Sequence, residues 1–262
     1  MVQYITSKTN NRIKDLLRLR QNKNREESKL FIVEGFHMLE MASEANIIKE
    51  VYTTKELDID KNIPQFIITN EILDKISSSI NAQGVVVVCH FIKEKPITSN
   101  KIIYLDNISD PGNLGTILRT ALAFNYLDVV MSPNCVSLYN DKSLSATQGA
   151  IFKLNIITKD IDYLKELKKD YKIIATSLKN SVDITSVPKY EKCILVFGNE
   201  GKGVREEILS ISDVNVIIPI KNIDSLNVGV ASGIVMFYES KYFILNIKDY
   251  YVIKLVATNL TK

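Results

Sequence analysis

Short apolar runs alternate with segments of helical spacing along most of the chain. In the first ninety residues, apolar runs of four to seven residues predict strands, and the helical spacing of Ile13, Leu16 and Leu17 predicts a helix near the start. The predicted strands are 31–34, 47–53, 65–68 and 84–89, and the predicted helices are 10–21, 36–45 and 71–77, the last with Asn70 as N-cap. This order predicts a small α/β domain.

After a polar segment with one proline, KEKPITSN at 93–100, the alternation becomes regular. The predicted strands are 102–105, 128–131, 155–158, 171–178, 192–197 and 214–220, and the predicted helices are 114–124, 143–150, 161–169, 204–210 and 225–242. Strands that are apolar throughout, in alternation with helices, are typical of a parallel sheet with helices on both faces. We therefore predict an α/β fold with two domains, 1–92 and 101–262, joined by a linker at 93–100.

The composition is that of an ordinary globular protein. The 262 residues are 46% hydrophobic and 24% charged, with a mean hydropathy of +0.03, which excludes a disordered chain or a fibre. No uncharged apolar run is long enough to span a bilayer, and the N-terminus has no stretch typical of a signal peptide. Three scattered cysteines and two histidines cannot form a zinc-finger spacing. We expect a cytoplasmic protein with no metal and no membrane partner.

Positive charge is concentrated at the N-terminus, although the net charge is only +3. Residues 1–30 carry eight Lys and Arg against three Asp and Glu, and they include Arg12, Arg18, Arg20 and Arg25, four of the six arginines. Guanidinium groups match phosphate oxygens, and a basic helix at a chain end is typical of nucleic-acid binding. A solvated helix face would account for the same charge, so both readings stay open.

Three loops that follow predicted strands carry the candidate chemistry, because ligands of open α/β sheets bind at the carboxyl ends of strands. The first is DNISDPGNLGTILR, in which Pro111-Gly112 makes the turn, Asn113 is a candidate cap, and Gly115 allows the helix to approach its strand closely. Arg119 is a charged residue in an otherwise apolar helix. It is either a surface arginine or a clamp for phosphate or ribose.

The second and third loops add a carboxylate and a polar helix start. In GNEGKG at 198–203, three glycines indicate a positive φ or a close approach, and they hold Glu200 on a tight turn. In IPIKNIDSLN, Ser225 or Asn227 either caps the long apolar helix or meets the polar end of a ligand. Neither a P-loop nor a dinucleotide fingerprint fits these glycine spacings, which disfavours a nucleotide-dependent oxidoreductase.

Together the three loops resemble the motifs of the SpoU/TrmH family of RNA ribose 2′-O-methyltransferases. The matching segments occur in the expected order, and they are DNISDPGNLGTILRTA, LVFGNEGKGV and IPIKNIDSLNVGVASGI. The N-terminal segment NNRIKDLLRLR…SKLFIVEG is similar to the small substrate-binding domain of many members. The resemblance implies a parallel sheet with a trefoil knot in the C-terminal domain, S-adenosyl-L-methionine as the cofactor, and a homodimer in which the first-motif arginine acts across the interface.

The resemblance also assigns residues. It implies that Arg119, Asn113, Glu200 and Asn227 are catalytic. The concentration of charge in the N-terminal segment predicts that Arg12, Arg18, Arg20 and Arg25 bind RNA. The implied cofactor contacts are Thr176, Ser177, Leu178, Val196, Phe197, Gly198, Asn199, Gly201, Ile218, Ser225, Leu226 and Asn227. Because arginine stays protonated at neutral pH, we expect Arg119 to position phosphate and stabilise a developing alkoxide, rather than to act mainly as a base. Ribosomal RNA is the implied target, with transfer RNA or a catalytically silent RNA-binding protein as alternatives.

Overall fold

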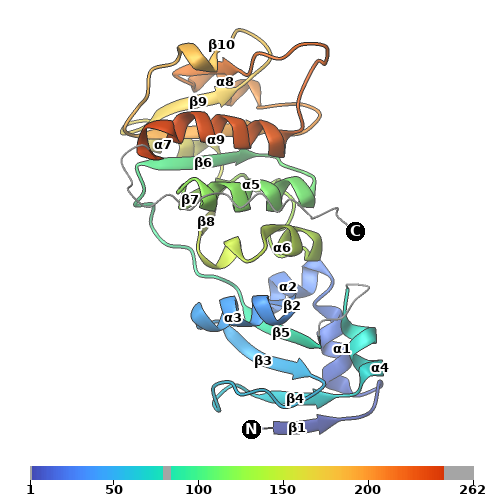
Figure 1. Ribbon diagram of the computed structural model, residues 1–262. Helices are drawn as coiled ribbons and strands as arrows, with labels where there is room; N and C mark the ends of the chain where they lie inside the picture. Colours follow the sequence, from blue (N-terminus) through green and yellow to red (C-terminus); the bar gives the residue numbers. More distant parts are fainter. Residues whose placement is uncertain (1, 79–83, 245–262) are drawn as a thin grey trace, which may run out of the picture.

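The computed structural model describes residues 2–78 and 84–244, which form two sheets placed one above the other along the molecule (Figure 1). The lower sheet has the strand order β1-β4-β3-β5-β2. Its strands are β1 Val2–Ile5, β2 Leu30–Glu34, β3 Ile48–Thr53, β4 Gln65–Ile68 and β5 Val85–His90. Its helices are α1 Asn11–Arg18, α2 Asn22–Ser28, α3 Phe36–Glu44 and α4 Asn70–Ile76. Strands β1, β4 and β3 are parallel, whereas β5 is antiparallel to both β2 and β3.

Every strand predicted in the first ninety residues is confirmed within about two residues, but two elements were missed. Strand β1 is short and largely exposed, and α2 (NKNREES) has no apolar stripe, so neither produces a periodic signal. Helix α1 ends at Arg18, before the predicted end at residue 21. Thr69, and not Asn70, caps α4, since its hydroxyl oxygen accepts the backbone N–H of Ile72 at 3.3 Å.

The upper sheet has seven parallel strands in the order β10-β12-β9-β11-β6-β7-β8. Its strands are β6 Lys101–Asp106, β7 Asp128–Met131, β8 Asn155–Thr158, β9 Lys172–Thr176, β10 Val182–Asp183, β11 Cys193–Gly198 and β12 Val214–Ile217. Its helices are α5 Pro111–Ala123, α6 Asp141–Thr147, α7 Ile161–Leu167, α8 Glu206–Ile211 and α9 Val228–Ile244. The predicted α/β fold with a parallel sheet is confirmed, and only the two-residue β10 was missed among its described strands.

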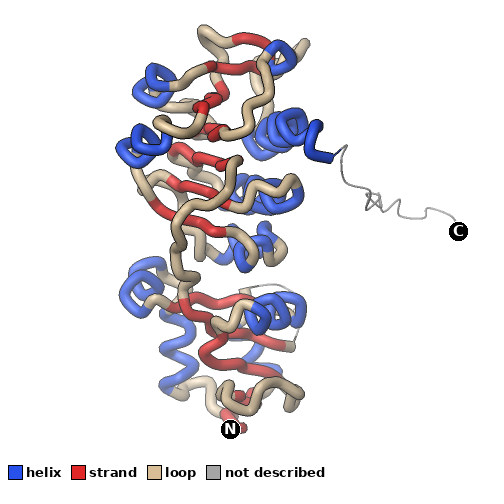
Figure 2. Tube along the Cα trace, turned by 90° about the vertical axis from the view of Figure 1, so that its left-hand side faces the viewer, coloured by secondary structure: helices blue, strands red, loops and turns tan. Residues whose placement is uncertain are grey.

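Helices cover both faces of the upper sheet (Figure 2). Alternation along β6 shows the two layers, because Ile103 and Leu105 pack with α5 and α9, whereas Ile102 and Tyr104 pack with α7 and α8. Gly115 serves a close approach, as predicted, but to a helix and not to a strand. A Cβ on Gly115 would lie 2.3 Å from the Cβ of Ala146 in α6.

The segment between the two sheets is fixed against the upper one. Residues 91–99 have no regular secondary structure, yet Asp128 Oδ2 accepts the backbone N–H groups of Thr98 and Ser99 at 3.0 and 2.7 Å. The ring of Tyr139 stacks on Phe91 at 3.8 Å. The domain boundary at 93–100 stays a prediction, but this segment is anchored along its length. Over residues 2–78 and 84–244, no helix has both the length and the apolar character required to cross a membrane.

Candidate functional site

The three candidate loops leave neighbouring strands of the upper sheet. Because all strands are parallel, their carboxyl ends lie at one edge, and β12, β9, β11 and β6 are adjacent in that order. The loops after β6, β11 and β12 are therefore brought together, although more than one hundred residues separate the first from the last in sequence.

A chain of side-chain hydrogen bonds joins the three loops. Asn113 donates its amide to Glu200 Oε1 at 3.0 Å, and Asn227 donates its amide to Asn113 Oδ1 at 2.9 Å. Asn227 Oδ1 then accepts the backbone N–H of Gly229 at 2.9 Å, at the start of α9. An ionised carboxylate only accepts hydrogen bonds, so Glu200 fixes the orientation of Asn113, which in turn fixes that of Asn227. We call this chain, Glu200–Asn113–Asn227, the amide relay.

Glu200 is held as an anion. Its Oε2 accepts the backbone N–H and the hydroxyl of Ser109, at 3.1 and 2.7 Å, and its Oε1 also accepts the backbone N–H of Asp110 at 3.0 Å. Burial raises the pKa of Glu200, but the hydrogen bonds from Ser109, Asn113 and Asp110 outweigh it and lower that pKa to about 2. At neutral pH the carboxylate is therefore an acceptor and not a proton donor.

The glycine loop that presents Glu200 closes on itself. The backbones of Asn199 and Gly203 exchange two hydrogen bonds of 3.0 and 2.8 Å. A Cβ on Gly198 would lie 2.2 Å from the backbone of Gly203, which has φ +71°. The predicted need for glycine is thus confirmed at these two positions. Asn199 also donates its side-chain amide to the carbonyl of Asn107 at 2.8 Å, which ties the loop to the end of β6.

The N-caps of α5 and α9 agree only in part with the prediction. Asp110, and not Asn113, caps α5, since its Oδ1 accepts the backbone N–H of Asn113 at 2.7 Å and Pro111 takes the first helical position. This leaves the Asn113 side chain for the relay. Of the two candidate caps of α9, Ser225 and Asn227, the structure selects Asn227. Ser225 lies in the exposed loop before the helix.

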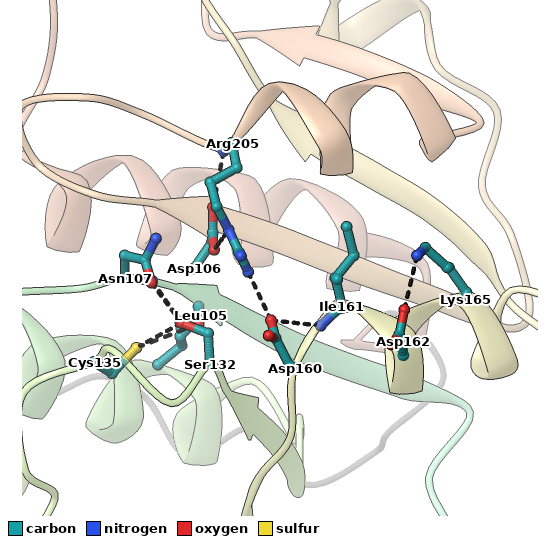
Figure 3. A network of polar contacts seen from close by, with 10 residues as sticks. All are labelled: Leu105, Asp106, Asn107, Ser132, Cys135, Asp160, Ile161, Asp162, Lys165 and Arg205. Atoms are coloured by element: carbon teal, nitrogen blue, oxygen red, sulfur yellow. Dashed lines mark hydrogen bonds and ion pairs between the residues drawn. The ribbon is translucent and has the colours of Figure 1, made fainter.

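An ion-pair clamp joins Arg205, two residues after the glycine loop, to the end of β6 (Figure 3). Asp106, fully buried at the end of β6, accepts the backbone N–H of Arg205 at 2.8 Å and its Nε at 2.7 Å. The guanidinium also donates to Asp160 Oδ1 at 3.1 Å, and Asp160 caps α7. Burial lowers the pKa of Arg205, but the bond to Asp160 and the charge of Asp106 raise it overall.

Sequence reasoning missed four residues that shape this site, namely Asp106, Ser109, Asp110 and Arg205. The signals for Ser109 and Asp110 were available, because small polar residues before a proline are typical of a helix start. Nothing in the sequence pattern pairs Asp106 with Arg205, which are 99 residues apart.

The predicted cofactor residues surround the ends of β9, β11 and β12. Thr176 donates its hydroxyl to the carbonyl of Val196 at 3.0 Å, which joins two of these strand ends. The side chains of Val196 and Phe197 are fully buried, so they could serve a ligand only through their backbone. Leu178 is exposed and Ile218 is half-buried. Both are apolar residues that follow strands ending at the same edge of the sheet as the amide relay. Apolar side chains at the ends of strands, beside the polar loops, suit an adenosine group, so the residues present fit S-adenosylmethionine.

Arg119 does not join the relay. It lies on α5, six residues after Asn113, which turns it about 240° around the helix axis from that residue. Its side chain is exposed and has no hydrogen bond or ion pair with any residue in the described part of the chain. The structure therefore brings together three of the four predicted catalytic residues and leaves the fourth facing outward.

The predicted RNA-binding arginines divide into two pairs. Arg25 is 3% exposed and donates to the carbonyls of Leu19 and Arg20, and burial lowers its pKa. Arg20 is largely buried and ion-paired within the protein. We withdraw these two from the predicted set, because their donors serve protein acceptors. Arg18 is exposed beside Asp15, and Arg12 pairs with Glu50 while keeping half its side chain exposed, so both stay available.

Within residues 2–78 and 84–244, no group of three or more His, Cys, Asp or Glu side chains is placed to hold a metal ion.

Comparisons with known proteins agree with this geometry. Residues 100–237 match the SpoU rRNA Methylase family, and residues 10–87 match the MRM3-like substrate binding domain. A relative from Bacillus subtilis, named 23S rRNA (guanosine(2553)-2′-O)-methyltransferase RlmP, is 31% identical over 90% of this chain and 99% of its own. An uncharacterized tRNA/rRNA methyltransferase from Synechocystis is 28% identical over 90% of this chain and 93% of its own.

Solved structures agree as well. The crystal structure of an AdoMet-bound rRNA methyltransferase from Sinorhizobium meliloti is 26% identical, covers 92% of this chain and 98% of its own, and superposes with a TM-score of 0.85. The predicted enzyme class, a methyltransferase, and the predicted methyl donor, S-adenosylmethionine, are confirmed. With the family match extending over more than half of its length, and the motif loops joined at one edge of a parallel sheet, this chain belongs to the SpoU rRNA methylase family.

Proposed function

We propose that this protein methylates a ribose 2′-hydroxyl of ribosomal RNA with S-adenosylmethionine as the donor. The observation that carries the proposal is the amide relay, because it assembles residues of all three motif loops at the carboxyl edge of the sheet. The substrate-binding-domain match and the naming of the Bacillus subtilis relative for 23S rRNA support ribosomal RNA as the target. We expect the protein to act in the cytoplasm and the C-terminal domain to contain the trefoil knot of its family.

When bound, S-adenosylmethionine supplies an electrophilic methyl group on a sulfonium, and its leaving group is neutral. Thr176, Ser177, Leu178, Ile218 and Leu226 are the residues we expect to hold it, together with the backbone of the glycine loop. The relay keeps the loops around this position in one arrangement, which lowers the entropic cost of bringing the reactants together.

The 2′-hydroxyl is a weak nucleophile until its proton begins to leave. Glu200 is saturated with donors, and its lowered pKa makes it a poor proton carrier, so the proton released from the hydroxyl passes to bulk water. We assign the ribose to Arg119, the charged residue of the first-motif helix. A guanidinium remains protonated at neutral pH, so its role is to position a phosphate and to stabilise the developing alkoxide.

Arg119 faces away from Asn113 of its own chain, which favours its use by a second copy. Helix α9 packs on α5 and leaves Val230, Ile234 and Phe237 exposed on one face, at helical spacing. An apolar stripe of this kind on a rigid helix suits a self-complementary contact. We therefore propose a homodimer in which Arg119 of one subunit serves the relay of the other.

The variant Arg119→Ala tests this function. We expect methyl transfer to unmodified ribosomal RNA to fall by at least about a hundredfold, while calorimetry shows near-normal affinity for S-adenosylmethionine. Lys142→Ala, which removes an exposed cation from α6, serves as the control and should retain activity. Loss of donor binding in Arg119→Ala would contradict the assigned role, and absence of transfer by the wild-type protein would favour the silent RNA-binding alternative.

A further inference from the structure

Arg20 joins the two domains. It lies between α1 and α2 and donates to Glu34 Oε1 at 2.6 Å and to the carbonyl of Ile76, both in the lower domain. Its other terminal nitrogen lies 2.9 Å from Asp141 Oδ2 in the upper domain. The side chains of Arg20, Glu34 and Asp141 are only 20, 15 and 30% exposed, so solvent screens these contacts weakly. We call the Glu34–Arg20–Asp141 cluster the interdomain tie.

The position of the tie connects the basic segment with the catalytic edge. Asp141 is the first residue of α6, and α6 follows the loop that leaves the carboxyl end of β7. Since β7 pairs with β6, that loop belongs to the same edge of the sheet as the amide relay. Figure 1 shows α2 of the lower domain next to α6 of the upper one.

The rest of the interface is largely apolar, with two neutral hydrogen bonds, between His37 Nε2 and the carbonyl of Gln148 at 3.3 Å and from the backbone N–H of Ile92 to the hydroxyl of Tyr139 at 3.0 Å. Phe31 of β2 packs on Tyr139 at 4.5 Å, and Leu144 of α6 belongs to the same buried cluster. Apolar contacts are non-directional, so packed surfaces can shift by small rotations at little cost. A charged hydrogen bond with fork geometry restrains direction as well as distance. A cleft of about 200 Å³, lined by residues that include Arg20, Asp141 and His37, lies beside the tie.

We propose that Arg20 is a positioning residue that sets the orientation of the substrate-binding domain relative to the methyltransferase domain, and thereby the affinity for RNA, without contacting the RNA. This inference rests on the proposed function, because it assumes that exposed cations near α1, such as Arg18, hold the RNA whose ribose reaches the catalytic edge. A rotation of one domain would then displace the bound phosphates relative to Arg119 and weaken productive binding.

Substitutions of Asp141 test the tie better than substitutions of Arg20. Arg20 also bonds Glu34 and Ile76 within the lower domain, whereas its ion pair with Asp141 crosses the interface. Asp141→Lys places a like charge beside Arg20, Asp141→Asn removes the attraction, and Asp141→Glu keeps the charge. Asp162→Lys and Asp162→Asn are matched controls. Asp162 is also an acid in the first turn of a seven-residue helix, so its loss costs the same helix-dipole interaction, but its ion pair with Lys165 is exposed and local.

Four quantities separate a positioning role from local damage, all measured on the full chain. These are the dissociation constant for a ribosomal RNA fragment, the KM and kcat for methylation of that fragment, and the affinity for S-adenosylmethionine by calorimetry. We expect Asp141→Lys to weaken RNA binding and raise the KM for RNA on the order of tenfold, with kcat and donor affinity within about twofold of wild type. Asp141→Glu and both Asp162 variants should remain close to wild type.

Hydrogen exchange gives a readout that does not depend on activity. The backbone N–H of Ile92 donates to the hydroxyl of Tyr139 at 3.0 Å across the interface, so faster exchange at this amide in Asp141→Lys would report a shifted domain contact. Unchanged RNA affinity in Asp141→Lys would overturn the proposal, as would an equal loss of donor affinity. Because RNA affinity and exchange are measured without methyl transfer, failure of the proposed function would leave these two results intact.

Discussion

Asn227 donates its side-chain amide to the Oδ1 of Asn113 at 2.9 Å, and this contact joins the start of α9 to the first turn of α5. Glu200 determines which group donates in this bond. Its carboxylate takes the amide nitrogen of Asn113, so the Oδ1 of Asn113 is left to accept from Asn227. A single carboxylate thus fixes the orientation of both asparagine side-chain amides. The consequence is that a change at any member should disturb all three motif loops.

Asn113→Asp is the sharpest test of the relay. The new carboxylate would stand 3.0 Å from Glu200, where the amide donor stood, and like charges at this distance repel. We expect kcat/KM to fall by about thirtyfold in Asn113→Ala, from roughly 2 kcal/mol of lost hydrogen bonding, and further in Asn113→Asp. Steady-state kinetics with labelled donor measure both variants. Equal activity of the two would show that the charge of Glu200 plays no part in ordering Asn113.

The ionisation of Glu200 should not contribute to the pH dependence of the reaction rate. Its pKa is lowered in the folded protein, from 4.5 to about 2, so its stabilising contribution is complete above the unfolded value and is lost only as the pH falls toward 2. We expect Glu200→Gln to lower the rate by a constant factor between about pH 6 and pH 9, with an unchanged profile. A profile that loses an ionisation in this variant would instead identify Glu200 as a proton carrier.

The Arg205 clamp should matter through the buried charge of Asp106. Arg205→Met leaves a fully buried carboxylate without its cation, which costs about 3 kcal/mol and lowers Tm by roughly 6 to 12 °C. Adding Asp106→Asn removes the unpaired charge and should restore part of the loss. Thermal melting measures both steps, with Lys165→Met, which breaks an exposed ion pair, as the control. A double variant less stable than Arg205→Met would contradict this account.

Local patterns were sufficient to predict the frame of the site. The strand β11, fully apolar and followed by three glycines within six residues, identifies both a buried parallel strand and a tight loop after it. Glu200 is therefore located by rules that act within ten residues. For Asn227 the local rules leave a choice, because Ser225 and Asn227 were both candidate caps of the long apolar helix and the structure selects Asn227.

The roles of the arginines depend on tertiary burial, which the pattern does not contain. Arg12 and Arg18 lie within the same basic segment as Arg20 and Arg25, yet Arg25 is buried on two backbone carbonyls and Arg20 pairs with an acid 121 residues away. A count of charges along the sequence cannot distinguish the exposed arginines from the buried ones. The N-cap of α5 was predicted wrongly for a different reason. Asp110 and Asn113 are both good N-caps, and Pro111 at the first helical position is a local signal that favours Asp110.

This division of the arginines predicts opposite effects of two similar substitutions. Arg18→Ala should weaken RNA binding and reduce the slope of log K against log salt by about 1, with an unchanged Tm, because it removes one exposed phosphate contact. Arg25→Ala should lower Tm while leaving the salt slope unchanged, since it deprives the carbonyls of Leu19 and Arg20 of their donors. Salt titrations of RNA affinity together with thermal melting separate the two, and a reduced salt slope in Arg25→Ala would restore this residue to the RNA-binding set.

Mixed dimers test whether Arg119 acts across the subunit interface. Arg119→Ala and Asn113→Ala should each retain only about a few per cent of wild-type activity or less on their own. In a heterodimer of the two, one site receives Asn113 from the first subunit and Arg119 from the second, and is therefore complete. Random exchange makes half of the dimers mixed with one working site each, so the mixture should recover about a quarter of wild-type activity. Phe237→Glu, which puts a charge on the exposed face of α9, should abolish this recovery by preventing dimer formation, as size-exclusion chromatography would show. Absence of recovery in a mixture shown to exchange subunits would place Arg119 in its own subunit's site.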